Sequence, residues 1–151
     1  MGDVMSDPAK EITGPFCHDL MVQVMLDLHP DLVSNVDYVC AHDFDKADPS
    51  QHGDPYFMVW KRADIPQPDP ADIKAAFEAD EETYRAAFAR RYRDACLAGT
   101  DGRANVTDAP PSARLDARID AWRTFRQALR DIPQQAGFPF AIEWPAYPGD
   151  A

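Results

Sequence analysis

The stretch from residue 122 to residue 148 constrains the fold of this chain more than any other feature. It contains four prolines, at positions 133, 139, 145 and 148. Because proline lacks a backbone N–H and clashes with the preceding helical turn, these positions exclude a continuous helix beyond residue 131. We therefore expect residues 132–151 to form an extended, proline-rich tail, in which only residues 140–144 have the composition of a β-strand.

The same stretch is rich in large apolar side chains, which make up nine of its 27 residues. They are Trp122, Phe125, Leu129, Ile132, Phe138, Phe140, Ile142, Trp144 and Tyr147. These groups need to be covered, because contact between apolar surface and water is unfavourable. Two interpretations are open: the tail folds back on its own domain, or it docks on a partner, where an extended proline-limited segment loses little entropy.

Two long helices are predicted before the tail. Asp69 and Pro70 form a favourable helix start, with a capping side chain followed by proline at the first helical position. Apolar residues then recur at helical spacing as far as Gly99, which predicts one helix of about 28 residues. Ser112 is placed to cap a second helix that runs to residue 130. We expect the two helices to form an antiparallel hairpin over residues 70–131.

The first part of the chain predicts a smaller module with both helix and strand, which makes the fold class α+β. Residues 1–14 are polar and are expected to form a loose N-terminal arm, ordered only if something docks it. Residues 15–28 have the wide apolar face of a helix that His29-Pro30 ends. Residues 36–42 and 56–61 are predicted to pair as antiparallel strands joined by a long loop, which completes a front module over 15–61. Residues 62–69 then form a proline linker.

The net charge is −11 at pH 7 and is concentrated in the first half of the chain. Residues 1–70 contain 13 acidic and four basic side chains, whereas residues 71–151 contain 13 acidic and 11 basic ones. Nucleic acid is a poor candidate as a partner, because phosphate contacts need a clustered positive face. An acidic inhibitor protein that occupies a basic surface is an alternative, and its binding would weaken as salt rises.

The cysteines and the hydropathy pattern bear on location. Cys17, Cys40 and Cys96 are odd in number and widely spaced, which fits buried free thiols better than a disulfide framework or a zinc knuckle. The first residues show no basic start followed by an apolar run, and no segment approaches eighteen uninterrupted apolar residues. We expect a soluble protein that is neither secreted nor bound to a membrane.

Residues 42–54 are the most favourable place for metal or enzymatic chemistry, since they gather carboxylates and imidazoles. These are His42, Asp43, Asp45, Asp48, His52 and Asp54. Oxygen-rich sets of this kind suit calcium or magnesium, but the sixth and twelfth positions counted from Asp43 are not the glycine and glutamate of an EF-hand. Aspartate is also favoured in solvated turns, and this is the interpretation we adopt.

No catalytic constellation is found elsewhere in the sequence. His18 and His29 flank an apolar helix and are expected to be structural. The motifs GxSxG, Walker A, HExxH and GxGxxG are absent from the sequence, and Cys17 and His18 are adjacent, which is a poor arrangement for activating a nucleophile. We therefore expect no enzymatic activity, no metal and no cofactor.

Arginines are frequent on the second predicted helix, at positions 114, 118, 123, 126 and 130. One interpretation is that they clasp an acidic partner or the acidic first half of this chain. The other, which we favour, is an ordinary charged helix face that pairs with Asp116, Asp120 and Asp131.

The C-terminal sequence resembles the phage tail assembly chaperone family. The family pattern has a tryptophan, an Arg-Gln-x-Leu-Arg-Asp-Ile-Pro core and a closing Trp-Pro-x-x-Pro, and the run WRTFRQALRDIPQQAGFPFAIEWPAYP contains each part. The matching positions extend over about 60 residues: Arg93, Leu97, Asp101, Asp108, Trp122, Arg126, Leu129, Arg130, Pro133, Pro139, Trp144, Pro145 and Pro148. Phe125 stands where the family usually has tyrosine, and Gly102 where it often has tryptophan.

The first half resembles small phage tail-region proteins. It shares with them a histidine-proline helix end at His29-Pro30, an aspartate-aromatic strand at Asp37-Tyr38, an aspartate-rich turn, a strand ending in Trp60, and a Pro-x-Pro linker.

Together the two resemblances imply a phage tail assembly protein that acts by binding tail, tail-fibre or baseplate subunits in the host cytoplasm. A permanent component of the virion tail is the alternative, and a homo-oligomer is compatible with either. The expected partner-binding residues are Trp122, Arg126, Leu129, Arg130, Phe138, Phe140, Trp144 and Tyr147.

Overall fold

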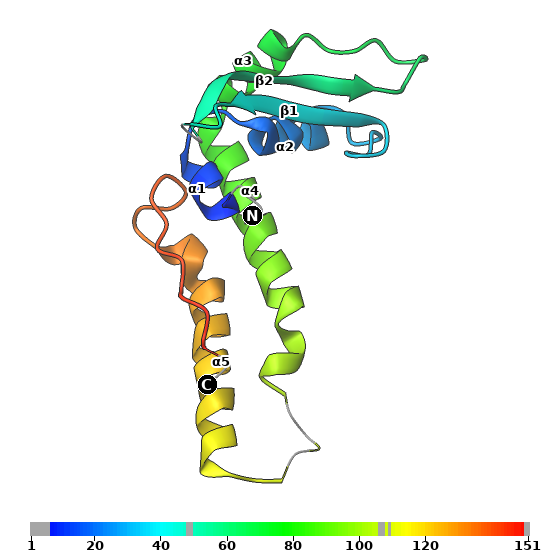
Figure 1. Ribbon diagram of the computed structural model, residues 1–151. Helices are drawn as coiled ribbons and strands as arrows, with labels where there is room; N and C mark the ends of the chain where they lie inside the picture. The colour runs from blue at the N-terminus through cyan, green and yellow to red at the C-terminus, as the bar shows by residue number, and fades with distance from the viewer. Residues whose placement is uncertain (1–6, 48–49, 106–107, 109, 150–151) are drawn as a thin grey trace. The chain divides into compact units, whose positions relative to one another are not determined.

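The computed structural model describes residues 7–47, 50–105, 108 and 110–149, and its fold is α+β as predicted (Figure 1). The chain divides into two compact units, residues 1–88 and residues 89–151, which we call the N-terminal unit and the C-terminal unit. The division falls inside a helix, between Phe88 and Ala89, whereas the sequence suggested a linker at residues 62–69.

Helix α1 (Pro8–Thr13) lies in the segment that was expected to be a loose arm, of which residues 1–6 are outside the described residues. The Asp7 side chain caps the helix by accepting a hydrogen bond from the Ala9 amide at 3.1 Å. Ile12 is completely buried. Arg85 of α4 (Glu81–Gly99) donates to the carbonyl oxygens of Ile12 and Gly14, at 2.5 and 2.8 Å. Residues 7–14 are therefore held by contacts within their own unit.

Helix α2 (His18–Leu28) supplies much of the core of the N-terminal unit. It begins three residues inside the predicted helix and ends at Leu28, as His29-Pro30 predicted. Its buried residues are Leu20, Met21, Val22, Val24 and Met25. They pack against helix α3 (Pro70–Ala79) and against the two strands.

Strands β1 (Tyr38–Phe44) and β2 (Gln51–Trp60) form the predicted antiparallel pair. Both reach further into the aspartate-rich segment than expected, so that Asp43 lies opposite His52. Backbone pairing sets this length, and Pro55 is tolerated within β2 because each strand of a two-stranded sheet is an edge. Figure 1 shows the hairpin extending beyond α2 toward its turn.

The predicted linker after β2 is held by a tryptophan. The Trp60 indole donates from Nε1 to the carbonyl oxygens of Arg62 and Ile65, at 2.9 and 3.0 Å. Because the Trp60 Nε1–H group is shared between the carbonyls of Arg62 and Ile65, residues 62–65 turn tightly around the indole ring before the chain reaches α3.

The prediction of one helix over residues 70–99 is wrong, because α3 and α4 are separate helices with Asp80 between them. Asp80 has φ −145° and ψ 50°, and its carbonyl accepts from the Tyr84 amide at 3.3 Å. Asp80 is the C-cap of α3, and its amide donates to the Phe77 carbonyl at 3.2 Å. The apolar spacing did not reveal the break because Phe77 and Tyr84 still meet, with ring centroids 6.4 Å apart.

In the C-terminal unit, the end of α4 is followed by α5 (Ala113–Asp131), which Ser112 caps as predicted by accepting from the Leu115 amide at 3.1 Å. A short 3₁₀ helix (Ile132–Gln134) contains Pro133 and leads into turns over residues 136–140. The strand considered for residues 140–144 does not form, and residues 142–149 continue without regular structure. Among the described residues, no helix combines the length and the apolar character needed to cross a membrane.

Candidate partner-binding surface

The tail of the C-terminal unit folds back on that unit's own core. The core consists of Ala104, Trp122, Phe125, Leu129 and Ile132, and Cys96, Leu97, Phe138, Ile142 and Trp144 pack against it. The Trp144 ring also meets Tyr92 of α4 edge to face, with centroids 4.9 Å apart. Four of the expected partner-binding residues thus contribute to packing within the unit: Trp122, Leu129, Phe138 and Trp144.

A pair of hydrogen bonds fixes the turn at the start of the tail. Gln135 donates to the Glu143 carbonyl at 2.9 Å and accepts from the Glu143 amide at 2.8 Å. Inside this loop, the Gly137 carbonyl accepts from the amides of Phe140 and Ala141. A Cβ atom at Gly137 would lie 2.6 Å from the Ala141 carbonyl oxygen, so this close approach requires glycine.

Arg126 points inward, to the end of α4. Its Nη1 donates to the Leu97 carbonyl at 2.6 Å and to the Thr100 hydroxyl at 2.9 Å, and its Nη2 contacts the Asp101 carboxylate at 2.5 Å. The last carbonyls of a helix lack partners within the helix, and Arg126 supplies one. Its side chain is therefore engaged in joining α5 to α4.

Arg130 lies on the outside of α5, where it borders a shallow hollow. The residues that line the hollow are Ala104, Asn105, Arg123, Thr124, Arg126, Gln127 and Arg130. Positions 123, 126, 127 and 130 fall on one helical face, so their spacing was a usable signal for Gln127. No such signal marked Thr124. Arg123 pairs with Asp120 at 3.5 Å, while Arg114 and Arg118 are exposed elsewhere on the helix.

Phe140 and Tyr147 differ from the rest of the aromatic tail, because they remain 52% and 62% exposed. The Tyr147 ring is nevertheless held in place, with its centroid 4.8 Å from that of Phe125 and 6.0 Å from that of Trp122. Partial burial, together with the neighbouring Cys96, raises the pKa of the Tyr147 hydroxyl. The tail thus covers most of its apolar surface and leaves two aromatic side chains accessible.

The described carboxylates of residues 42–54, those of Asp43, Asp45 and Asp54, each bind a different partner. Asp43 accepts from the Tyr56 hydroxyl at 3.0 Å, Asp45 from the Ala47 amide at 2.9 Å, and Asp54 pairs with Lys74 at 2.9 Å. Asp48 lies outside the described residues. Each of the three carboxylates has its own local partner, which supports the interpretation as turn and strand residues.

The three cysteines are free thiols, but only Cys17 and Cys40 are buried as expected, whereas Cys96 is partly exposed. Cys17 and Cys40 are buried and unpaired with each other, and burial raises the pKa of both thiols to about 12. A thiol with so high a pKa stays protonated at neutral pH and is a poor nucleophile.

The comparisons with known proteins divide the chain in a similar way. Residues 86–149 match the family model of the phage tail assembly chaperone protein, and residues 21–85 match the model of the XkdW protein, a phage protein family. Neither curated proteins nor solved structures give a match to the chain. The two matches confirm both resemblances, each over less than half of the chain.

The C-terminal match supports a role in phage tail assembly. It covers α5, the Arg126 contacts and the whole described tail. The matched family is described as a chaperone, a description that names no catalytic activity.

Proposed function

We propose that this protein is an assembly chaperone that holds a phage tail subunit through its C-terminal unit. The observation that carries the proposal is the exposure of Phe140 and Tyr147 on a tail that otherwise packs against its own core. Aromatic side chains dominate the binding energy of protein interfaces. These two lie in the segment that matches the chaperone family.

The packing of the tail prepares these side chains for binding. Tyr147 rests on Phe125 and Trp122, and the Gln135–Glu143 pair holds the loop that carries Phe140. A side chain that is already ordered loses less entropy when a partner covers it. The buried Trp122 therefore acts in binding indirectly, by positioning the tail.

The hollow beside α5 indicates the chemistry of the partner. Arg123 and Arg130 line it, and both present their guanidinium groups to solvent. Arginine recognises carboxylates with paired hydrogen bonds. The partner is thus a tail subunit with an apolar recess for the two aromatic side chains and an acidic group nearby.

We extend the proposal to the place of action and to the partner. A tail-fibre or baseplate subunit is the expected partner, and binding takes place in the host cytoplasm during assembly. Permanent residence in the virion tail makes a different prediction, because the chain would then be present in purified particles at a fixed ratio to the other tail proteins.

A capture experiment tests the proposal. Tagged protein is used to recover tail proteins from induced or infected cells, and the double variant Phe140→Ser, Tyr147→Ser is compared with wild type. We expect recovery to fall at least tenfold, while the far-ultraviolet circular dichroism spectrum stays unchanged. The control is Met58→Ser, which removes an apolar side chain of similar exposure, 59%, from β2. Undiminished recovery by the double variant would refute the role of the exposed pair.

Charge reversal tests the hollow separately. Arg130→Glu should slow association and weaken capture, whereas Arg118→Glu, on the same helix but outside the hollow, should not. Because the aromatic contacts supply most of the binding energy, capture by wild type should survive about 0.5 M salt, where exposed charges are largely screened. An acidic inhibitor would instead lose its partner under these conditions.

A further inference from the structure

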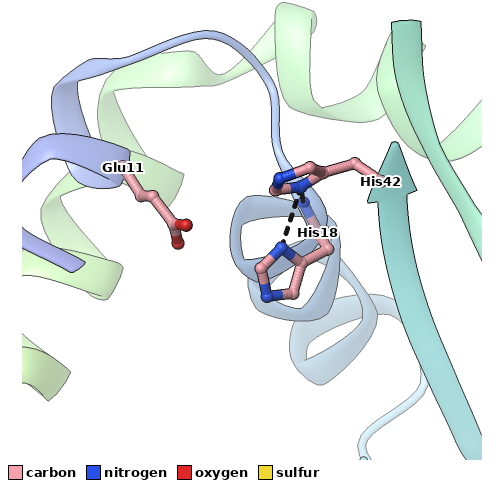
Figure 2. A group of neighbouring side chains, drawn as sticks. All are labelled: Glu11, His18 and His42. Carbon is pink, nitrogen blue, oxygen red and sulfur yellow. Dashed lines mark hydrogen bonds between the residues drawn. The ribbon is translucent and has the colours of Figure 1, made fainter. Parts of the chain in front are cut away.

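A second site is formed in the N-terminal unit by three side chains from three elements. Glu11 comes from α1, His18 is the first residue of α2, and His42 lies on β1 (Figure 2). One potential ligand atom from each lies within 4.8 Å of the other two. All three residues are partly buried, so the site is sheltered and still reachable from solvent.

The two imidazole rings already face each other through their Nδ1 atoms, which are 2.9 Å apart. The backbone amide of His18 also donates to the His42 Nδ1 atom at 3.3 Å, so the lone pair of this nitrogen is directed toward His18. A bound ion would replace this hydrogen bond and the contact between the two Nδ1 atoms. Figure 2 shows the Glu11 carboxylate directed toward this pair from the neighbouring helix. The three side chains thus face one another, although His42 follows His18 by 24 residues in the sequence.

The other ring nitrogen of His18 has a carboxylate near it. Its Nε2 atom lies 3.6 Å from the Asp19 carboxylate. Histidines that bind metals typically have a carboxylate or carbonyl at the ring nitrogen that does not bind, because it fixes the ring orientation and makes the ligand nitrogen more basic. Asp19 is placed to do this for His18.

We propose that Glu11, His18 and His42 bind a divalent transition-metal ion of the zinc type. Two imidazoles and one carboxylate, with an open fourth position, are a ligand set that suits zinc. A tetrahedral centre with bond lengths of about 2.0–2.1 Å separates its ligand nitrogens by roughly 3.3 Å, so the two rings need to open only slightly. The ion would connect α1, α2 and β1, and the site is independent of the partner-binding surface proposed above.

Zinc titration of untagged, chelator-treated protein tests the site. Calorimetry should show one ion per chain, and a hundredfold excess over Kd should raise Tm by roughly 5–10 °C. Cobalt(II) should give visible absorption bands of a tetrahedral centre. His18→Gln and His42→Gln should each abolish these signals, and Glu11→Gln should weaken binding at least tenfold. Asp19→Asn should weaken it by about 10–100-fold.

The control is His52→Gln, which removes an exposed imidazole of the same hairpin and should bind zinc as wild type does. Unfolding of each variant without metal shows whether it is folded, and Glu11→Gln keeps the size of the side chain in case a histidine variant is not. Absence of stoichiometric binding by wild type would overturn the proposal. So would binding that persists in His18→Gln and His42→Gln, or binding that is lost in His52→Gln.

Discussion

Arg126 on α5 donates a hydrogen bond to the main-chain carbonyl of Leu97, 2.6 Å away in the last turn of α4. The same guanidinium group reaches the Thr100 hydroxyl and the Asp101 carboxylate. Three partners on one short segment mean that a single side chain fixes how the end of α4 meets α5. Arg126 is part of the Arg-Gln-x-Leu-Arg-Asp-Ile-Pro core, so this contact accounts structurally for one residue of the family pattern.

Replacing Arg126 with Met should destabilise the protein. The change keeps much of the aliphatic length but removes the donors, and it leaves the Leu97 carbonyl without this partner in a half-buried place. The expected loss is about 1–3 kcal/mol in the free energy of unfolding. Urea denaturation followed by tryptophan fluorescence measures it. Arg123→Met is the matched control, because Arg123 is 65% exposed on the same helix and should change stability little.

Replacing Gly137 with Ala should disturb the turn that starts the tail. The new Cβ atom would lie 2.6 Å from the Ala141 carbonyl oxygen and 2.9 Å from its Cβ atom, so the backbone must move. Overpacking of this kind costs about 1–3 kcal/mol. Hydrogen exchange should show faster exchange at the Phe140, Ala141 and Glu143 amides, which the turn protects. Gly149→Ala, with open space around it, should leave both measurements unchanged.

Much of the fold could be predicted from the sequence, where local chemistry decides the structure. Asp69-Pro70 and Ser112 start helices as expected, because a capping side chain and the fixed φ of proline act within a few residues. The end of α2 at Leu28 follows from Pro30 for the same reason. The break at Asp80 was missed because the apolar spacing continues across it.

The candidate surface was predictable only in part, because exposure depends on contacts between distant residues. The composition of the tail indicated that Trp144 and Tyr147 are important. It did not indicate that the Trp144 ring packs against Tyr92 while the Tyr147 side chain stays exposed. Likewise, nothing in the sequence joins Glu11 and His18 to His42, since a helix, a turn and a strand bring them together. Of the possible ligands in residues 42–54, only His42 belongs to this cluster, and its neighbours there come from outside that segment.

Replacing Arg85 with Met should release α1 from the N-terminal unit. Arg85 donates to the carbonyl oxygens of Ile12 and Gly14 and also pairs with Glu81 at 2.8 Å. Without these donors, two carbonyls at the end of α1 lose their partners, so local opening should become easier. Limited proteolysis should then cut near residues 10–14 at least several times faster. Glu81→Gln separates the contribution of the ion pair from that of the two hydrogen bonds to carbonyl oxygens. It removes only the ion pair and should leave the cleavage rate close to that of wild type.

Replacing Tyr84 with Phe should change how stability depends on alkaline pH. Burial, helped by a 2.9 Å hydrogen bond to Asp27 and by the nearby Asp80, raises the pKa of the Tyr84 hydroxyl to about 12 from an ordinary value of 10.0. A raised pKa in the folded state means that the neutral hydroxyl contributes stability fully below pH 10, and that this contribution is lost as pH rises toward 12. At pH 8, the wild type should exceed Tyr84→Phe by about 1 kcal/mol in the free energy of unfolding, the value of one hydrogen bond.

Urea denaturation of both proteins at pH 8, about 10.5 and about 11.5 should show this difference shrinking at the higher values. The substituted phenylalanine cannot ionise, and the thiols of Cys17 and Cys40 contribute equally in both proteins. A difference that stays constant over this range would show that Tyr84 does not ionise there with a raised pKa.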